Sequence, residues 1–234
     1  MGRHFEVRAK AMEATAKKKS AIYMRASKEI YIAAKQGTPD PDSNLALRSA
    51  IDKYKSQGVP KDVIERAIKK AAGGEQEAYI AGRYEFFGPG GSYIVVDSLT
   101  DNPNRALVEI KTTIVRKGGH MASVLYNFEE KGLFVFTGKN EQEVEEALIL
   151  NDVDVTEVTE EDGEISVLVA PHDFSKARDI LQEIGVNDFI VSEIKLIPND
   201  YITLDGEDLE KFKTLIDLLE ELQDVQNIFH NVKL

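Results

Sequence analysis

The sequence predicts an α+β fold in which a basic helical N-terminal domain precedes acidic layers of mixed helices and strands. Up to residue 73, apolar residues recur at the 3.6-residue period of helices. Beyond residue 78, short β-rich runs alternate with helical segments and hairpin turns, which favours α+β layers over a doubly wound parallel sheet. The charge changes sign near the same place: residues 1–80 carry 16 Lys and Arg against 10 Asp and Glu, and residues 81–234 carry 13 against 31.

Length and composition bound the class of protein. At roughly 100–200 residues per domain, a chain of 234 residues forms one large domain or a few small ones. No run of about 18 apolar residues occurs and no apolar stretch follows the first charges, so we expect neither a membrane-spanning helix nor a secretory signal. Cysteine is absent, which excludes disulfides and thiolate metal sites and fits a cytoplasmic protein.

Three helices are predicted in the N-terminal part, each with its own end signals. The first runs over residues 10–36 and is ended by Gly37 and the prolines that follow it. Ser43 and Asn44 are good N-caps for the second helix, which Gly58 ends, and Pro60 suits the first turn of the third. The apolar stripes of the second and third helices are Leu47, Ala50, Ile51 and Tyr54, and Val63, Ile64, Ala67, Ile68 and Ala71.

The remaining chain alternates between strands and helices. A turn at 130–132 and a turn at 161–163 each predict a hairpin. The predicted strands are 92–99, 124–128, 133–136, 153–158, 164–169, 190–197 and 224–232. The predicted helices are 104–117, 141–150, 175–184 and one capped by Asp205.

Basic side chains gather on one side of the first predicted helix. At about 100° per residue, four lysines fall near one line and two further cations flank it. The aligned lysines are Lys10, Lys17, Lys28 and Lys35, and the flanking residues are Lys18 and Arg25. Such a face can neutralise phosphates and release counterions, so it predicts salt-dependent contact with a nucleic-acid backbone. The alternative is an acidic interaction protein whose lysines are only solvated.

No catalytic or cofactor-binding pattern is present. The histidines are His4, His120, His172 and His230, and their spacing matches no zinc site. The glycine-rich segment 88–91 precedes a predicted strand, whereas a dinucleotide loop follows a strand and opens a helix, so a turn is the better interpretation. We therefore expect no enzyme, no metal, no cofactor and no small-molecule substrate.

Several long motifs occur in a fixed order along the whole chain. They are residues 33–37 (Ala-Ala-Lys-Gln-Gly), 59–68 (Val-Pro-Lys-Asp-Val-Ile-Glu-Arg-Ala-Ile), 83–91 (Arg-Tyr-Glu-Phe-Phe-Gly-Pro-Gly-Gly), 99–105 (Leu-Thr-Asp-Asn-Pro-Asn-Arg) and 230–232 (His-Asn-Val). With them the chain resembles the YebC/PmpR family, which includes the mitochondrial translational activator of cytochrome c oxidase. The Lys-Gln-Gly motif at residues 35–37 and the His-Asn-Val motif at residues 230–232 resemble the YeeN-like branch of this family.

The resemblance implies an organisation in three domains. An N-terminal three-helix domain (1–78) would be followed by two α+β domains, the third (133–199) inserted into the second (79–132 plus 200–234). It also implies nucleic-acid binding through the helical domain, which carries over onto Lys17, Lys18, Lys19, Arg25 and Lys28. Asn102, Asn104 and Arg105 become further candidates, because their segment matches the family pattern.

The family resemblance leaves two nucleic acids open as the target. Members are commonly classed as probable DNA-binding transcriptional regulators, while a competing view makes them ribosome-associated factors that help translation through consecutive prolines and bind ribosomal RNA. The chain departs from the family at His4-Phe5, where a basic residue and tryptophan are usual. It departs again at 118–124, where a longer glycine-rich loop is usual.

Overall fold

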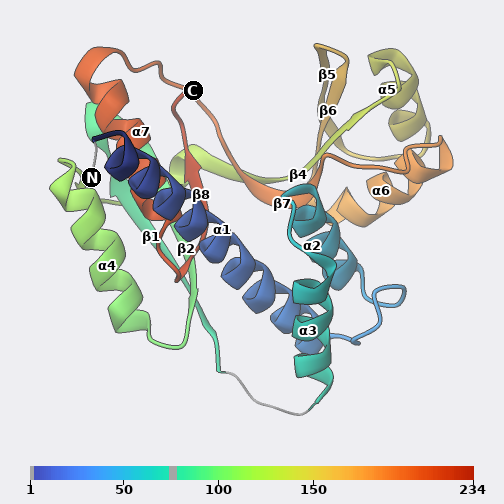
Figure 1. Cartoon of the computed structure of the whole chain (residues 1–234). Helices are drawn as coiled ribbons and strands as arrows, with labels where there is room; N and C mark the ends of the chain where they lie inside the picture. Colours follow the sequence, from blue (N-terminus) through green and yellow to red (C-terminus); the bar gives the residue numbers. More distant parts are fainter. Residues whose placement is uncertain (1–2, 74–77) are drawn as a thin grey trace.

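A computed structural model describes the backbone of residues 3–73 and 78–234 and the side chains of 18–73 and 78–234. The chain begins with three helices that form one unit, here called the helical unit (Figure 1). These are α1 (Arg3–Gln36), α2 (Leu45–Ser56) and α3 (Lys61–Ala72). All three were predicted, and α1 begins earlier than expected. The predicted stripes pack together around the buried side chains of Ala26, Ile30, Leu47, Tyr54, Ile64 and Ala67.

Asn44 sets both the start of α2 and the path of the chain before it. Its Oδ1 accepts a hydrogen bond from the backbone N–H of Leu47 at 3.0 Å, which is the predicted N-cap. Its Nδ2 donates to the carbonyl oxygens of Ala33 and Thr38, both at 2.8 Å. One amide side chain therefore ties the end of α1, the loop and the start of α2.

The first sheet is antiparallel, with strand order β3-β1-β2-β8. Two helices cover one of its faces, where Phe86, Ile94, Ile110, Ile114 and Phe212 form the core. The strands are β1 (Ile80–Phe87), β2 (Tyr93–Thr100), β3 (His120–Met121) and β8 (Val225–His230), and the helices are α4 (Pro103–Arg116) and α7 (Gly206–Glu220). The glycine-rich segment 88–91 is a turn between β1 and β2, as predicted.

The second sheet is also antiparallel, with strand order β5-β6-β4-β7. One face is covered by two helices over a core that includes Phe134, Phe136, Val144, Leu148 and Leu181. The strands are β4 (Phe128–Thr137), β5 (Val155–Glu161), β6 (Glu164–Val169) and β7 (Val191–Pro198), and the helices are α5 (Glu141–Leu150) and α6 (Phe174–Glu183). The fold is therefore α+β, as predicted from the mixed hairpins and helices.

The predicted hairpin around residues 130–132 is wrong. β4 runs without interruption from Phe128 to Thr137 and pairs with β6 on one side and β7 on the other. Residues 125–127 form a short 3₁₀ turn instead of a strand. Gly132 lies inside β4 because the ring of Phe174 and the side chain of Val169 pack over it, within 2.9 Å of where a Cβ would lie. Its glycine reflects close packing and not a turn.

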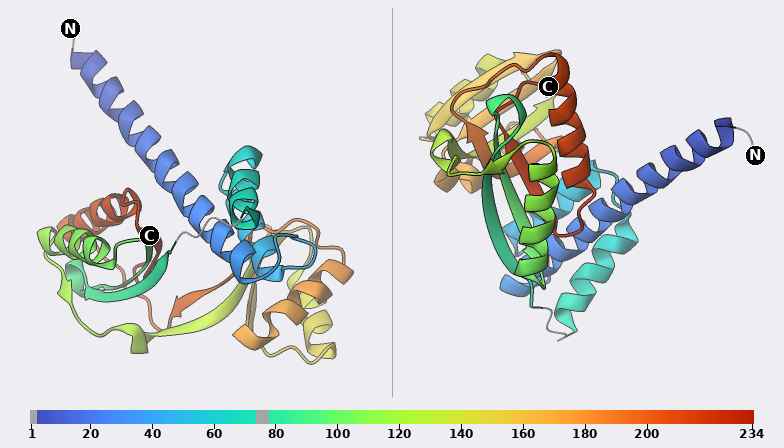
Figure 2. Two further views of the ribbon diagram at one scale, coloured as in Figure 1. Left: turned by 90° about the horizontal axis from the view of Figure 1, so that it is seen from below. Right: turned by 90° about the vertical axis from the view of Figure 1, so that its left-hand side faces the viewer.

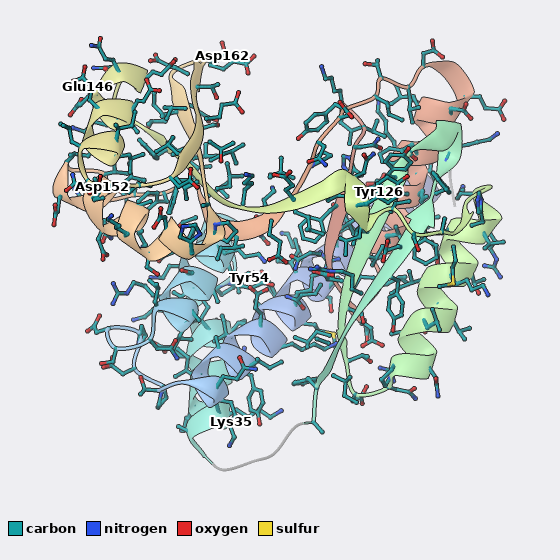
Figure 3. The ribbon with its side chains drawn as sticks, turned by 180° about the vertical axis from the view of Figure 1, so that it is seen from behind. Lys35, Tyr54, Tyr126, Glu146, Asp152 and Asp162 are labelled. Carbon is teal, nitrogen blue, oxygen red and sulfur yellow. The ribbon has the colours of Figure 1, made fainter. Side chains whose placement is uncertain are left out.

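The helical unit packs across the junction of the two sheets (Figure 2). Arg178 of α6 is 2% exposed and donates to Asp52 Oδ2 of α2 at 2.5 Å and to Ser49 Oγ at 3.0 Å. Tyr54 lies near the centre, where the three parts meet (Figure 3). The four strands of the second sheet lie between β3 and β8 in the sequence, and the predicted boundary between residues 132 and 133 falls inside β4.

Candidate nucleic-acid interface

The aligned lysines of α1 do not share one environment. Lys10 and Lys17 belong to α1, but their side chains lie outside the described residues. Lys19 is exposed. Lys35 is exposed at the far end of α1, beside α3 (Figure 3), where its Nζ reaches the carbonyl oxygen of Ala71 at 3.5 Å. Of the described lysines in the predicted set, Lys19 and Lys35 are therefore placed to meet a ligand from solvent.

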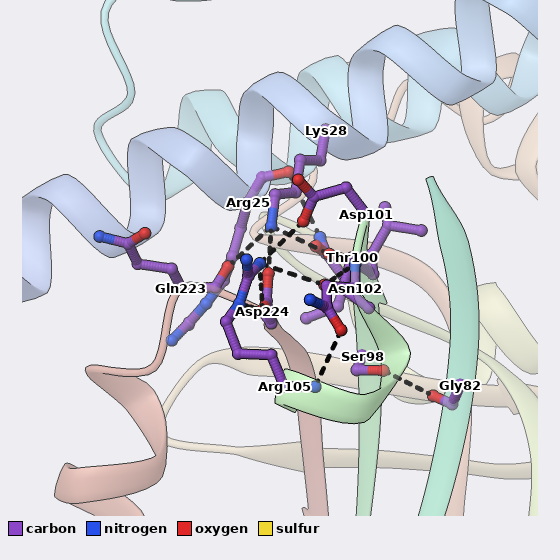
Figure 4. A network of polar contacts seen from close by, with 12 residues as sticks. Arg25, Lys28, Gly82, Ser98, Thr100, Asp101, Asn102, Arg105, Gln223 and Asp224 are labelled. Carbon is purple, nitrogen blue, oxygen red and sulfur yellow. Dashed lines mark hydrogen bonds and ion pairs between the residues drawn. The ribbon is translucent and has the colours of Figure 1, made fainter. Parts of the chain in front are cut away.

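Lys28 was predicted to lie on an open basic face of α1. Its side chain is instead buried between α1 and the first sheet. The residue is 7% exposed. Its Nζ donates to Asp224 Oδ1 at 3.0 Å and to the carbonyl oxygens of Leu99 and Gln223 at 2.9 and 3.0 Å (Figure 4). Three acceptors satisfy the three protons of the ammonium group. Lys28 thus holds the helical unit to the first sheet.

Arg105 completes the same polar network from α4. Its guanidinium donates to Asp224 Oδ2 through Nε at 2.9 Å and Nη2 at 2.7 Å, and to Asp101 Oδ1 at 2.8 Å (Figure 4). These hydrogen bonds, with that to Asp224 first, raise the pKa of Arg105. Burial opposes ionisation of Asp224, but hydrogen bonds from Arg105 and Lys28 outweigh it and lower the pKa of Asp224. Arg105 is therefore engaged by two carboxylates, while 45% of its side chain is exposed.

The two asparagines of this segment have different surroundings. Asn102 is the N-cap of α4, and its Oδ1 accepts from the backbone N–H of Arg105 at 3.1 Å. Asn104 is exposed in the first turn of α4. The predicted cluster of three ligands is thus resolved into a cap, an ion-paired arginine and one exposed amide.

Lys18 and Arg25 face the C-terminal end of α7. Lys18 Nζ lies 2.7 Å from Asp217 Oδ1 and 3.8 Å from Glu220 Oε2, and the hydrogen bond to Asp217 raises the pKa of Lys18. Arg25 donates to the carbonyl oxygen of Glu220, and burial lowers the pKa of Arg25. Cations at a helix C-terminus interact favourably with its dipole. Two residues of the predicted phosphate-binding face, Lys18 and Arg25, are therefore in contact with α7 of the same chain.

A groove between α1 and α3 is lined by basic and aromatic side chains. Its volume is about 600 Å³. Its rim carries Lys19, Arg66 and Lys70, and its walls include three tyrosines from α1 and from the segment before β1. The tyrosines are Tyr23, Tyr31 and Tyr79. Among the lining residues that the structure describes, none is acidic, although the chain has 41 Asp and Glu. We call this feature the α1–α3 groove.

Sequence reasoning missed the contribution of α3 to this surface. Arg66 and Lys70 are one helical turn apart, and the exposed Lys69 follows the same stretch of the helix. This spacing places basic side chains on neighbouring positions of the helix surface. The run was visible in the sequence, but only the packing of α3 along α1 shows that it faces Lys19 across the groove.

A second polar cluster lies where the helical unit meets both sheets. Tyr54 donates to Glu29 Oε2 at 2.7 Å, and Gln226 donates to the same carboxylate at 2.6 Å. Burial, with the Glu29 carboxylate second, raises the pKa of Tyr54. Lys53 bridges Glu29 and Glu193 at 3.2 and 3.5 Å. These groups satisfy one another and hold the units together.

Comparison with known proteins identifies the family of the chain. Residues 3–74 match the family described as TACO1/YebC protein N-terminal domain, and residues 79–232 match the TACO1/YebC second and third domain. The chain belongs to the TACO1/YebC family. It is 50% identical over 234 residues to a protein of Mesoplasma florum named a probable transcriptional regulatory protein, covering 99% of both chains. The family suggested by the motifs is thereby confirmed.

A solved structure supports the fold of this TACO1/YebC protein. The crystal structure of a conserved hypothetical protein from Aquifex aeolicus superposes with a TM-score of 0.76 at 30% identity. It covers 92% of this chain, which covers 90% of the other. Among the described residues, no group of His, Asp and Glu is arranged to hold a metal ion. None of the described helices combines the length and apolar character needed to cross a membrane.

Proposed function

We propose that this TACO1/YebC protein is a non-enzymatic regulator of gene expression that binds nucleic acid through the outer surface of its helical unit. The name of the Mesoplasma florum relative supports the regulatory role. Both nucleic acids considered, DNA and ribosomal RNA, are polyanions of the cytoplasm, where we place the activity. We propose that the protein acts without a catalytic step, cofactor, metal or small-molecule substrate.

The distribution of charge carries the proposal. Each sheet with its two covering helices is called a sheet unit. Residues 81–234, which form the first and second sheet units, hold 31 acidic against 13 basic side chains, so these units repel a phosphate backbone. The helical unit has the opposite balance, and three of its exposed cations, Lys19, Arg66 and Lys69, lie on or beside the α1–α3 groove. A nucleic acid that approaches this protein is therefore steered to α1 and α3 and turned away from the sheets.

Contacts with the two sheet units hold the helical unit in a fixed position. Lys18, Arg25 and Lys28 attach α1 to the first sheet unit, and Arg178 attaches α2 to the second. We propose three units with the second sheet unit inserted in the first, beginning near Phe128 where β4 starts. The arrangement supports a rigid basic face on an acidic body, which suits orientation on a large anionic partner.

The test compares two charge reversals of equal size. Lys19→Glu with Arg66→Glu changes the groove, and Lys111→Glu with Arg116→Glu changes exposed residues of α4. Fluorescence anisotropy with duplex DNA and with a folded ribosomal RNA fragment measures affinity at low salt. We expect the groove variant to lose at least about tenfold and the α4 variant to stay within about twofold, since only groove cations contact phosphates.

The comparison of the two variants and the comparison of the two nucleic acids each have an outcome that decides one part of the proposal. An equal loss in both variants, or no loss in either, contradicts the helical unit as the nucleic-acid interface. Tighter binding to duplex DNA supports transcriptional control, in agreement with the relative's name. Tighter binding to the ribosomal RNA fragment moves the regulation to translation while leaving the interface in the same place.

A further inference from the structure

We infer that the α1–α3 groove takes an unstacked base of a single-stranded nucleic acid, with the adjoining phosphates held by Lys19 and Arg66. This inference rests on the proposed function and adds the form of nucleic acid that the site accepts. The groove volume of about 600 Å³ lies inside the roughly 300–1,000 Å³ typical of small-molecule pockets, so it is large enough to enclose a base.

Aromatic rings give the groove the chemistry of a base-stacking site. Tyr23 projects from α1 and is half-buried, and Tyr79 reaches in from the segment before β1. Tyr31 is 3% exposed and meets Tyr79 edge to face at 5.9 Å between ring centroids, which orients the Tyr79 ring. Met24 and Val63 supply apolar walls. Stacking on aromatic side chains recognises every base, because each base has a π face.

The cations are placed where the phosphates of a bound strand would run. Lys19 and Arg66 lie on opposite helices of the groove, and its described lining residues include no carboxylate. Arg66 also pairs with Asp62 at 2.7 Å, but both side chains are about 70% exposed, so this pair is weak and open to exchange with a phosphate. Basic side chains around aromatic walls are the pattern of single-strand binding sites.

A neighbouring hollow sets the direction in which the strand leaves. This hollow of about 650 Å³ shares Met24, Lys28 and Tyr79 with the groove, and its other lining residues include four carboxylates and Arg105. Its acidic residues are Asp101, Glu109, Glu221 and Asp224. They repel phosphates on that side of Tyr79, so the strand is directed along α3. A paired duplex keeps its bases stacked and unavailable, so the groove selects single-stranded segments.

The experiment uses the full chain and single-stranded RNA and DNA of about ten nucleotides that carry the fluorescent base 2-aminopurine. Stacking on a tyrosine ring quenches this fluorescence. We expect quenching with the native protein and with Tyr23→Phe, which keeps the ring. Tyr23→Leu keeps apolar bulk but removes the ring, so we expect it to lose the quenching and about tenfold in affinity, equal to about 1.4 kcal/mol. Tyr126→Leu, at a tyrosine that is 71% exposed outside the groove, is the matched control.

The outcomes separate this inference from the proposed function. Native quenching and affinity in Tyr23→Leu, with weakened binding in Lys19→Glu with Arg66→Glu, overturn the base site alone. Unchanged binding in the charge-reversed variant overturns the proposed interface as well. Duplex affinity should be the same in Tyr23→Leu and the native protein, and a parallel loss on duplex contradicts the inference. Binding of single-stranded RNA or single-stranded DNA with quenching of 2-aminopurine supports the base site.

Discussion

At the scale of single residues, cations predicted to lie on the same basic face of α1 differ in burial and in contacts. Lys28 and Lys19 both belong to the basic set predicted on α1, yet Lys28 is buried against Asp224 while Lys19 is exposed beside the groove. Helical periodicity places a residue on a face but does not say what covers that face. The partner of Lys28 lies 196 positions away in the sequence, which no local pattern could supply.

Two substitutions distinguish the structural role of Lys28 from the binding role of Lys19. Lys28→Met removes a buried ammonium and leaves Asp224 with Arg105 alone, so we expect the free energy of unfolding to fall by about 3 kcal/mol, as for breaking a buried ion pair. Lys19→Met should change it by less than about 0.5 kcal/mol but should weaken nucleic-acid binding. Urea unfolding and anisotropy measure the two effects. Full stability of Lys28→Met together with weakened binding would place Lys28 on the phosphates and contradict this account.

At the scale of elements, the residues that begin and end helices predicted the helix bounds more accurately than apolar alternation predicted the strands. The second and third helices were placed by Asn44, Gly58 and Pro60 together with their apolar stripes, and α2 and α3 follow them closely. β1 was not predicted because, of its eight residues, only Phe86 is buried, so it lacks the alternation that marks a half-buried strand. β4 was divided because Gly132 was interpreted as a turn. Local patterns do not reveal a ring that packs over a glycine from another element.

The structure gives Gly132 a testable packing role. A Cβ at this position would lie 2.7 Å from Phe174 Cδ2 and 2.9 Å from Val169 Cγ2. We therefore expect Gly132→Ala to lower the free energy of unfolding by about 1–3 kcal/mol through overpacking. Thr137→Ala, at the exposed end of the same strand, should cost less than about 0.5 kcal/mol. Urea unfolding compares the two, and equal stability of both variants would contradict a close contact between Phe174 and β4.

At the scale of the whole molecule, the charge is divided along the chain: residues 1–80 carry 16 basic against 10 acidic side chains, and residues 81–234 carry 13 against 31. The formal net charge of −12 hides this division, which is visible only when the two parts of the sequence are counted separately. The sequence did not show that α7 and the loop before β8 would cover Lys18, Arg25 and Lys28. The sequence therefore placed the candidate site on the helical unit without showing which of its cations the rest of the chain covers. Arg66, Lys70 and Tyr79 join the groove through the packing of α3 and of the segment before β1 along α1.

The salt dependence of binding shows whether the cations of the α1–α3 groove contact phosphates. The slope of log affinity against log salt concentration counts the phosphates that protein cations neutralise, at about 0.9 per contact on duplex DNA. We predict that Lys19→Gln with Arg66→Gln makes this slope shallower by about 1.8, while Lys111→Gln with Arg116→Gln leaves it unchanged. A slope that is the same in the groove variant as in the native protein would mean that the α1–α3 groove does not contact nucleic acid.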